Sequence, residues 1–191
     1  MEKIDKRQEI MKVAMELIAE QGFHGAPMSE IAEKAGVAAG TIYRYFQSKE
    51  ALIEVMSYEL ESRLIAILME GYPAETSVRE RFFHIMTLLL QHFIAHPLHF
   101  RFMEQYHNSP YGVSQRRERL LGKSKEQDIV KKLIEEGIAK GQLKDLPLAV
   151  LSGLAFGSMI IIIQDHILGF VSLDEPLVQK IVEASWDAIK K

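Results

Sequence analysis

The sequence predicts an all-α protein in which a three-helix helix-turn-helix domain is followed by a helical ligand-binding and dimerisation domain. Apolar residues recur three and four positions apart along most of the 191 residues, and no segment alternates with period two over a useful length. Glycine, proline and capping residues separate these stretches where helices begin or end. We place the boundary after residue 50, which gives domains 1–50 and 51–191.

The first domain contains three predicted helices. The first carries a buried stripe and ends at a glycine corner at Gly22. The second begins near residue 28 and ends at Gly36, because the chain needs a left-handed residue there and glycine adopts that conformation at little cost. The third covers about Ala39 to Phe46. The stripe of the first helix comprises Ile10, Val13, Ala14, Leu17 and Ile18.

The third helix presents a surface suited to a groove of DNA. Ile42 and Phe46, four positions apart, form its buried side. Small residues at its start permit close approach of the backbone, while hydroxyl, phenol and guanidinium groups supply donors. Each residue alone is more often an ordinary surface or core-edge residue, whereas the combination favours DNA binding. The predicted DNA-binding residues are Ser29, Ala39, Gly40, Thr41, Tyr43, Arg44, Tyr45 and Lys49.

The run from Gly36 to Phe46, followed by Ser48-Lys49-Glu50-Ala51-Leu52, resembles the DNA-binding domain of the TetR/AcrR family of bacterial transcriptional regulators. The resemblance implies that residues 39–45 form the major-groove helix, with Thr41 and Tyr43 on backbone or base edges and Lys49 on a phosphate. It further implies a homodimeric regulator, expected to be a repressor, that binds a palindromic double-stranded DNA operator and is released by a small hydrophobic effector.

Two features favour an alternative, a helical interaction module of the same fold that has lost DNA binding. Residues 1–56 hold seven Lys and Arg against nine Asp and Glu, and the whole chain has a net charge of −3. Ala26-Pro27-Met28 stands where the family usually has threonines before the second helix, although Pro27 can still begin a helix. By contrast, Arg44 and Lys49 flank the predicted groove helix with positive charge, which favours DNA binding.

The second domain is predicted to be helical throughout. The helix that begins near Glu50 continues without a break into the 60s, and so connects the two domains. The layout around residues 137–147 is also similar to the regulatory domain of the TetR family. The further predicted segments are Ser77–Ala95, a shorter one through Phe100 to Tyr106, a polar helix from Val113 to Lys140, one from Pro147 to about Gly169, and Glu175–Lys190 with Asp174 as its cap.

No charged residue lies between Asp145 and Asp165. This stretch is too short and too often interrupted by small and polar residues to span a membrane, so we predict no membrane association. A helix that is apolar on all sides is buried on all sides, either in a core or between a core and a second subunit. The predicted dimerisation residues are Gly153, Gly157, Ile161, Leu177, Ile181 and Trp186.

Aromatic and methionine side chains are concentrated in the middle helices. Such stripes are most often core, but scattered polar groups nearby, including His96, His107 and Gln164, are of the kind that orients a ligand in an apolar pocket. The predicted effector-binding residues are Phe82, Met86, Phe93, Phe100, Met103, Tyr106, Met159 and Ile163.

The sequence favours neither a cofactor nor a catalytic site. His92, His96 and His99 have metal-like spacing, but Pro97 interrupts the helix that would carry them, so no metal is expected. The chain has no cysteine, no G-x-S-x-G and no G-x-x-x-x-G-K, which argues against an enzyme. Residues 1–20 lack the apolar run of a secretory signal, so a cytoplasmic location is expected.

Overall fold

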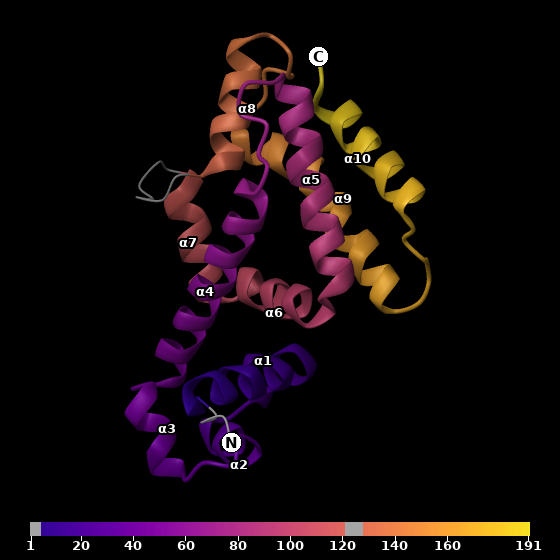
Figure 1. Cartoon of the computed structure of the whole chain (residues 1–191). Coiled ribbons are helices and arrows are strands. Elements are labelled where there is room, and N and C mark those ends of the chain that lie inside the picture. Colours follow the sequence, from indigo (N-terminus) through magenta and orange to yellow (C-terminus); the bar gives the residue numbers. More distant parts are fainter. Residues whose placement is uncertain (1–4, 121–127) are drawn as a thin grey trace. The chain divides into compact units, whose positions relative to one another are not determined.

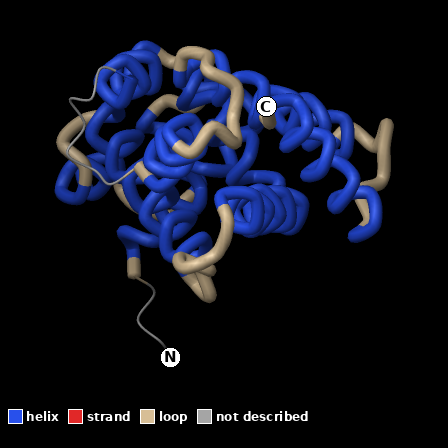
Figure 2. The backbone as a smooth tube through the Cα atoms, turned by 90° about the horizontal axis from the view of Figure 1, so that it is seen from above, coloured by secondary structure: helices blue, strands red, loops and turns tan. Residues whose placement is uncertain are grey.

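The computed structural model describes residues 5–120 and 128–191, and its helices confirm the predicted all-α class. Figure 1 follows the helices along the chain, and Figure 2 shows loops and turns between them. The helices are α1 (Lys6–Gly25), α2 (Met28–Lys34), α3 (Ala39–Tyr45), α4 (Lys49–Met69), α5 (Val78–Ala95), α6 (Pro97–Asn108), α7 (Pro110–Leu120), α8 (Ile129–Ala139), α9 (Leu148–Ile167) and α10 (Glu175–Ile189).

The chain divides into two compact units. The first unit comprises Met1–Leu64 and Pro97–Val113, and the second comprises Ile65–His96 and Ser114–Lys191. Two of the boundaries fall inside α4 and α7, so each of these helices carries residues of both units. The units are not separated by a single cut, and the sequence-based boundary after residue 50 stays a prediction.

In the first unit, α1 packs against α6. The predicted stripe on α1 is buried, and Phe102 of α6 is fully buried with its ring edge-to-face against Phe23, at a centroid distance of 6.3 Å. Gly22 has φ of 71°, so the regular part of α1 ends at the predicted glycine corner. α6, which the prediction includes in the domain 51–191, belongs to the same compact unit as the helix-turn-helix.

In the second unit, α5 packs against α8, α9 and α10. The ring of Phe82 lies 5.4 Å from that of Trp186 and 6.2 Å from that of Phe156. Burial of such a side chain contributes about 1.5–3 kcal/mol to folding. Ser77 begins α5 with a capping box, in which its hydroxyl accepts the Glu80 N–H at 3.2 Å and the Glu80 carboxylate accepts the Ser77 N–H at 3.0 Å.

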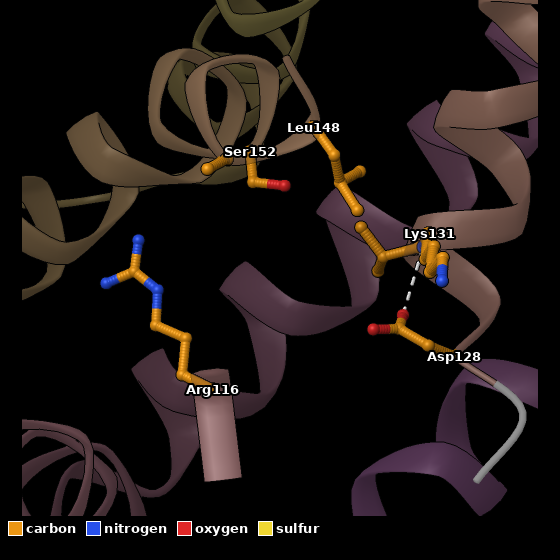
Figure 3. Close-up of a pocket in the computed structure, with 7 residues that line it drawn as sticks. Arg116, Asp128, Lys131, Leu148 and Ser152 are labelled. Atoms are coloured by element: carbon orange, nitrogen blue, oxygen red, sulfur yellow. Dashed lines mark hydrogen bonds between the residues drawn. The ribbon is translucent and has the colours of Figure 1, made fainter. Parts of the chain in front are cut away.

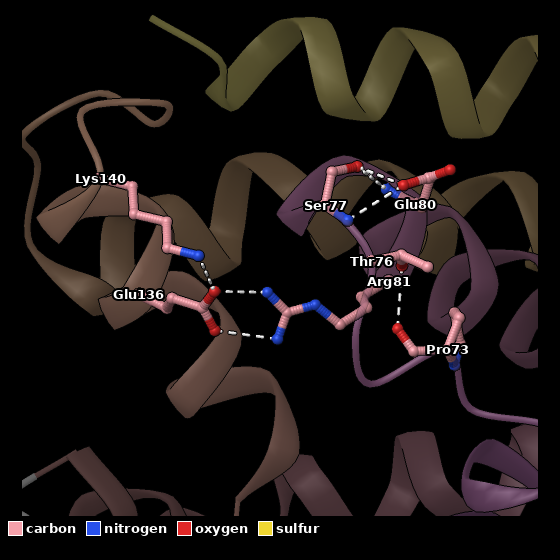
Figure 4. Close-up of polar contacts among 7 residues, drawn as sticks. All are labelled: Pro73, Thr76, Ser77, Glu80, Arg81, Glu136 and Lys140. Atoms are coloured by element: carbon pink, nitrogen blue, oxygen red, sulfur yellow. Dashed lines mark hydrogen bonds and ion pairs between the residues drawn. The ribbon is translucent and has the colours of Figure 1, made fainter.

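A largely buried ion pair joins α5 to α8. The two terminal nitrogens of Arg81 donate to the two carboxylate oxygens of Glu136 at 2.9 and 2.5 Å, and Arg81 is only 8% exposed (Figure 4). Lys140 donates to the same carboxylate at 2.7 Å. These hydrogen bonds, first those from Arg81 and then that from Lys140, lower the pKa of Glu136 to about 2.

The predicted continuous helix from Val113 to Lys140 is wrong. Asp128 has an extended backbone, and its carboxylate accepts the Lys131 N–H at 3.0 Å, which begins a new helix, α8. α7 and α8 are therefore separate helices, and residues 121–127 of the predicted helix lie outside the described residues.

The predicted ends of the last two helices are confirmed to within two residues. Gly169 has φ of 79° just beyond the end of α9. Asp174 caps α10, and its carboxylate accepts the Leu177 N–H at 2.9 Å. Capping of this kind satisfies N–H groups that have no partner within the helix.

Candidate nucleic-acid interface and regulatory surfaces

The backbone between α2 and α3 forms the predicted turn. α2 begins after Pro27, which has an extended backbone and supplies no side-chain cap. Gly36 has φ of 64°, and the Val37 N–H donates to the Ala32 carbonyl at 2.9 Å. A left-handed residue followed by such a bond is a common end for a helix, and the predicted role of Gly36 is confirmed.

α3 has one buried side and one open side. Ile42 and Phe46 are buried, whereas Tyr43 and Tyr45 are 54% and 44% exposed. Tyr43 and Tyr45 are therefore the exposed aromatic side chains of this seven-residue helix. Among the predicted DNA-binding residues, Thr41 and Lys49 are half-buried and the others are exposed, namely Ser29, Ala39, Gly40, Tyr43, Arg44 and Tyr45.

Lys49 makes a contact that the sequence analysis did not anticipate. Its ammonium donates to the backbone carbonyl of Phe23, near the end of α1. Partial burial lowers the pKa of Lys49, and the nearby charge of Glu50 opposes this effect. Lys49 therefore holds α4 to the end of α1 within the first unit, and its contact with a phosphate stays a prediction.

Arg7 is likewise engaged within the first unit. Its guanidinium donates to the Glu59 carboxylate at 2.6 Å and lies 5.7 Å from the centroid of the Phe46 ring. Neither contact was predictable from the sequence, because residues so far apart in the chain leave no local signal. On α3 itself, the exposed donor groups are the guanidinium of Arg44 and the phenols of Tyr43 and Tyr45.

α9 has one buried line and an open opposite face. A Cβ at Gly153 or Gly157 would meet no atom within 4 Å, and Ile161 is 57% exposed. By length and composition this helix could also cross a membrane, a weak criterion that core helices of soluble proteins meet as well. The buried line is Leu151, Ala155, Met159 and Ile163, and the exposed large apolar residues are Val150, Leu154, Ile160 and Ile161.

The predicted dimerisation residues of α10 are more covered. Leu177 and Ile181 are half-buried. Trp186 packs on Phe82 inside the second unit and is 7% exposed, so we remove it from the predicted dimer surface. Helical periodicity placed Trp186 on an apolar face correctly, but it did not indicate that α5 covers that face.

The predicted effector-binding residues are all buried, and the structure divides them between the two units. Phe100, Met103 and Tyr106 belong to the first unit and the other five to the second. The predicted pocket stays a prediction. For metals, no group of three His, Cys, Asp or Glu side chains comes together in the described part of the chain.

An exposed α3 on a helix-turn-helix, followed by a helical unit, defines the class of DNA-binding transcriptional regulators. The family of bacterial regulatory proteins called tetR matches residues 10–56, and the tetracyclin repressor-like C-terminal domain matches residues 78–190. The chain belongs to the TetR family. Its members are transcriptional regulators.

Solved structures of TetR-family regulators match nearly the whole chain. A TetR family protein from Vibrio parahaemolyticus is 33% identical, with 98% of this chain and 99% of that one covered and a TM-score of 0.75. A TetR-family transcriptional regulator from Haemophilus influenzae is 23% identical, with coverage of 98% and 97% and a TM-score of 0.79, which shows the shared fold.

Relatives named for fatty acid metabolism are also similar. The fatty acid metabolism regulator protein of Bacillus subtilis is 36% identical over 80 residues, which cover 42% of this chain and only 41% of that protein. The structure of FadR from Bacillus subtilis in complex with stearoyl-CoA is 22% identical, with coverage of 95% and 98% and a TM-score of 0.73. This second similarity shows the fold alone.

Proposed function

We propose that the protein is a homodimeric repressor that binds a palindromic operator through α3 and is released by a small hydrophobic effector. The observation that carries the proposal is the open side of α3, where Tyr43, Arg44 and Tyr45 are exposed while Ile42 is buried. A helix of this kind can enter the major groove, with its donors directed at phosphates and base edges.

Dimerisation is supported by the open face of α9. Gly153 and Gly157, four residues apart, leave room for close approach of a second helix, and Val150 and Ile161 supply exposed apolar surface beside them. Burial of this surface against a second copy would remove it from water. In a two-fold dimer the two α3 helices engage half-sites about 34–36 Å apart, or a multiple of that distance, which requires a palindromic operator.

The effector is expected to be largely apolar. The second unit holds Phe82, Met86, Phe93, Met159 and Ile163, all buried on α5 and α9. Because FadR from Bacillus subtilis shares the fold and binds stearoyl-CoA, molecules with long acyl chains are the first class to test. A regulator that acts on an operator works in the cytoplasm.

A second function remains to be tested, that of an interaction module which has lost DNA binding. Two observations support it. The cations of Arg7 and Lys49, near α3, are engaged in contacts within the first unit. In addition, α2 begins without a side-chain cap.

Binding to the DNA upstream of the gene that encodes this protein separates the two functions. We expect the wild-type chain to shift this duplex specifically and Tyr43→Ala to weaken binding by about tenfold, because a lost contact in the groove costs about 1–3 kcal/mol. Tyr58→Ala is the matched control, since Tyr58 is 63% exposed on α4 and lies outside α3. Equal binding by all three proteins would rule out the assigned role of α3.

A further inference from the structure

The end of α4 lies in the second unit, which begins at Ile65. The last four carbonyls of a helix lack the N–H partners that a continuing helix would supply. In α4 the carbonyls of Ala66, Ile67 and Met69 accept from backbone N–H groups just beyond the helix, at 3.1, 3.2 and 3.3 Å. The remaining carbonyl, that of Leu68, accepts from a side chain of α5 instead.

This side chain is His84. Its Nε2 lies 3.0 Å from the carbonyl oxygen of Leu68. Because a carbonyl oxygen only accepts, Nε2 carries the proton and donates it to this bond. Leu68 is only 5% exposed, so its carbonyl would be poorly supplied with water if the donor were lost.

Tyr72, just beyond α4, packs against the same imidazole. The rings of Tyr72 and His84 meet edge-to-face, with a centroid distance of 5.8 Å and an interplanar angle of 70°. We call the His84 ring, the Tyr72 ring and the Leu68 carbonyl the α4–α5 clamp. Three residues before His84, Arg81 joins α5 to α8 through Glu136, so the clamp is attached to an anchored helix.

The turn of α5 that carries the clamp also carries two predicted effector-binding residues. Arg81 and His84, three positions apart, lie on one side of the helix, whereas Phe82 and Met86, four positions apart, lie on another. Phe82 and Met86 are 2% and 0% exposed, and the Phe82 ring lies 5.4 Å from that of Trp186. An effector that binds against Phe82 and Met86 therefore has to displace packed side chains.

The cavity in Figure 3 does not remove this requirement. It measures about 130 Å³, and its lining, which includes Arg116, Lys131 and Ser152, contains none of the predicted effector-binding residues. Small-molecule sites usually occupy about 300–1,000 Å³. The cavity is too small for a molecule with a long acyl chain, so binding of such a molecule against α5 requires α5 or its neighbours to shift.

We propose that the α4–α5 clamp transmits effector binding from α5 to the helix-turn-helix. This inference rests on the effector part of the proposed function and names the contact through which release is transmitted. α4 runs back from the clamp to Lys49, which follows α3, and its residues up to Leu64 belong to the first unit. A shift of α5 displaces α4 only while the Leu68 carbonyl is held. The effector then changes operator affinity to the extent that it favours one position of α4.

Amide hydrogen exchange of the full chain tests the clamp without DNA or effector. The reporters are the N–H groups of Glu70 and Tyr72, which close the last turn of α4. His84→Leu keeps a side chain of similar size but removes the donor. It should accelerate exchange at both reporters about 2- to 10-fold, the effect of one ordinary hydrogen bond. His84→Gln, whose amide can donate, should return exchange toward the wild-type rate.

Thr76→Val is the matched control. It also removes a side-chain bond to a carbonyl in the α4–α5 connection, that of the Thr76 hydroxyl to Pro73 at 2.9 Å, but Thr76 is exposed and Pro73 lies outside α4. Exchange in this variant should stay within about twofold of wild type. Tyr72→Ala removes the second ring of the clamp and should accelerate exchange at Glu70. If His84→Leu and Tyr72→Ala both exchange like Thr76→Val, the clamp is overturned.

Operator affinity with and without stearoyl-CoA tests transmission. Stearoyl-CoA is the probe because FadR from Bacillus subtilis, which shares the fold, binds it. Wild type should lose about fivefold or more of its operator affinity when the probe is added. His84→Leu should bind the operator within about twofold of wild type and should lose less than about twofold on addition. A protein that is merely destabilised would bind the operator less well in both conditions, so retained binding without release is specific to the clamp.

Operator binding also provides a test that needs no effector, because coupling between two sites is reciprocal. Binding of the upstream duplex should change amide exchange in the α5 turn, residues 82–86, in wild type but not in His84→Leu. Unchanged exchange in this turn of the wild-type protein would overturn transmission through the clamp.

The outcomes keep the two proposals apart. If stearoyl-CoA releases the operator from wild type and from His84→Leu alike, transmission through the clamp is wrong and the effector function stands. If operator binding changes exchange in the α5 turn only when His84 is present, but stearoyl-CoA does not release wild type, the clamp stands and this effector is wrong. If wild type binds no upstream duplex, the proposed function and transmission are both wrong, and exchange at Glu70 and Tyr72 reports the contact alone.

Discussion

Arg81 and Glu136 form a two-point ion pair, with nitrogen to oxygen distances of 2.9 and 2.5 Å, that connects α5 to α8. Arg81 is almost fully buried, and its Nε is buried without a hydrogen-bond partner among the described residues. The carboxylate of Glu136 therefore supplies most of the negative charge and hydrogen bonding that balance this buried guanidinium. Removal of one partner from a buried pair is costly, because the remaining charge loses its counter-charge.

Because the Glu136 side chain is 32% exposed, Glu136→Gln should destabilise the protein by about 1.5–3 kcal/mol in chemical denaturation, the range for hydrogen bonds to charged groups. The control is Glu135→Gln, whose carboxylate is more exposed and has only the 3.9 Å contact with Lys131, and it should cost less than about 0.5 kcal/mol. Equal stability of the two variants would show that the ion pair does not hold α5 to α8.

The same pair predicts how stability depends on pH. Because folding lowers the pKa of Glu136 from 4.5 to about 2, its contribution is fully present above pH 4.5 and is lost as the pH falls toward 2. Wild type should lose stability across this window more steeply than Glu136→Gln. Parallel curves for the two proteins would contradict the assignment.

Gly112→Ala should strongly destabilise the fold. A Cβ at this position would lie 2.2 Å from the Tyr106 carbonyl oxygen and 2.8 Å from the His107 Cα, both backbone atoms that cannot move aside easily. We expect a loss of more than about 2 kcal/mol, in the upper range of overpacking effects. Gly40→Ala is the control, because a Cβ there meets nothing within 4 Å, and its change should stay within about 1 kcal/mol.

Gly157→Leu should abolish the dimer without harming the protomer. A Cβ at this position would meet no atom of the chain within 4 Å, and a leucine side chain would obstruct a second helix packed against it. Overpacking costs about 1–3 kcal/mol at each of two symmetric sites. Sedimentation velocity should show a wild-type dimer, a Gly157→Leu monomer, and a dimer for Lys132→Leu, which adds leucine to an exposed position of α8. A monomeric wild type at micromolar concentration would remove the dimer.

Lys49→Ala should affect stability and DNA binding together, whereas Tyr43→Ala should affect binding alone. The bond from Lys49 to the Phe23 carbonyl is expected to contribute about 1 kcal/mol to stability. If Lys49 also contacts a phosphate, its loss from both subunits should lower the slope of log affinity against log salt by about two. An unchanged slope with lowered stability would limit Lys49 to its structural role.

Features set by neighbouring residues were predicted well from the sequence. The left-handed Gly36, the end of α1 at Gly22 and the Asp174 cap all depend on backbone conformation or on groups within a few residues. The break before α8 had a similar signal in Asp128, an N-cap residue type, which the helical period of the flanking segments obscured.

Features set by distant packing were not predictable in this way. An apolar helix face does not indicate which element covers it, so Trp186 was assigned to a dimer although α5 covers it. In the same way, the apolar pattern of α6 did not indicate that it packs on α1. The contacts of Arg7 and Lys49 join positions 52 and 26 residues apart.

The stoichiometry and symmetry of operator binding test the central claim most directly. A labelled duplex that contains the upstream sequence bound by the protein should sediment with two protein chains, and scrambling either half-site should weaken binding sharply. Addition of the effector should release both chains together. One chain bound per duplex, or binding that is unaffected when both half-sites are scrambled, would contradict a dimeric regulator that reads a palindrome through α3.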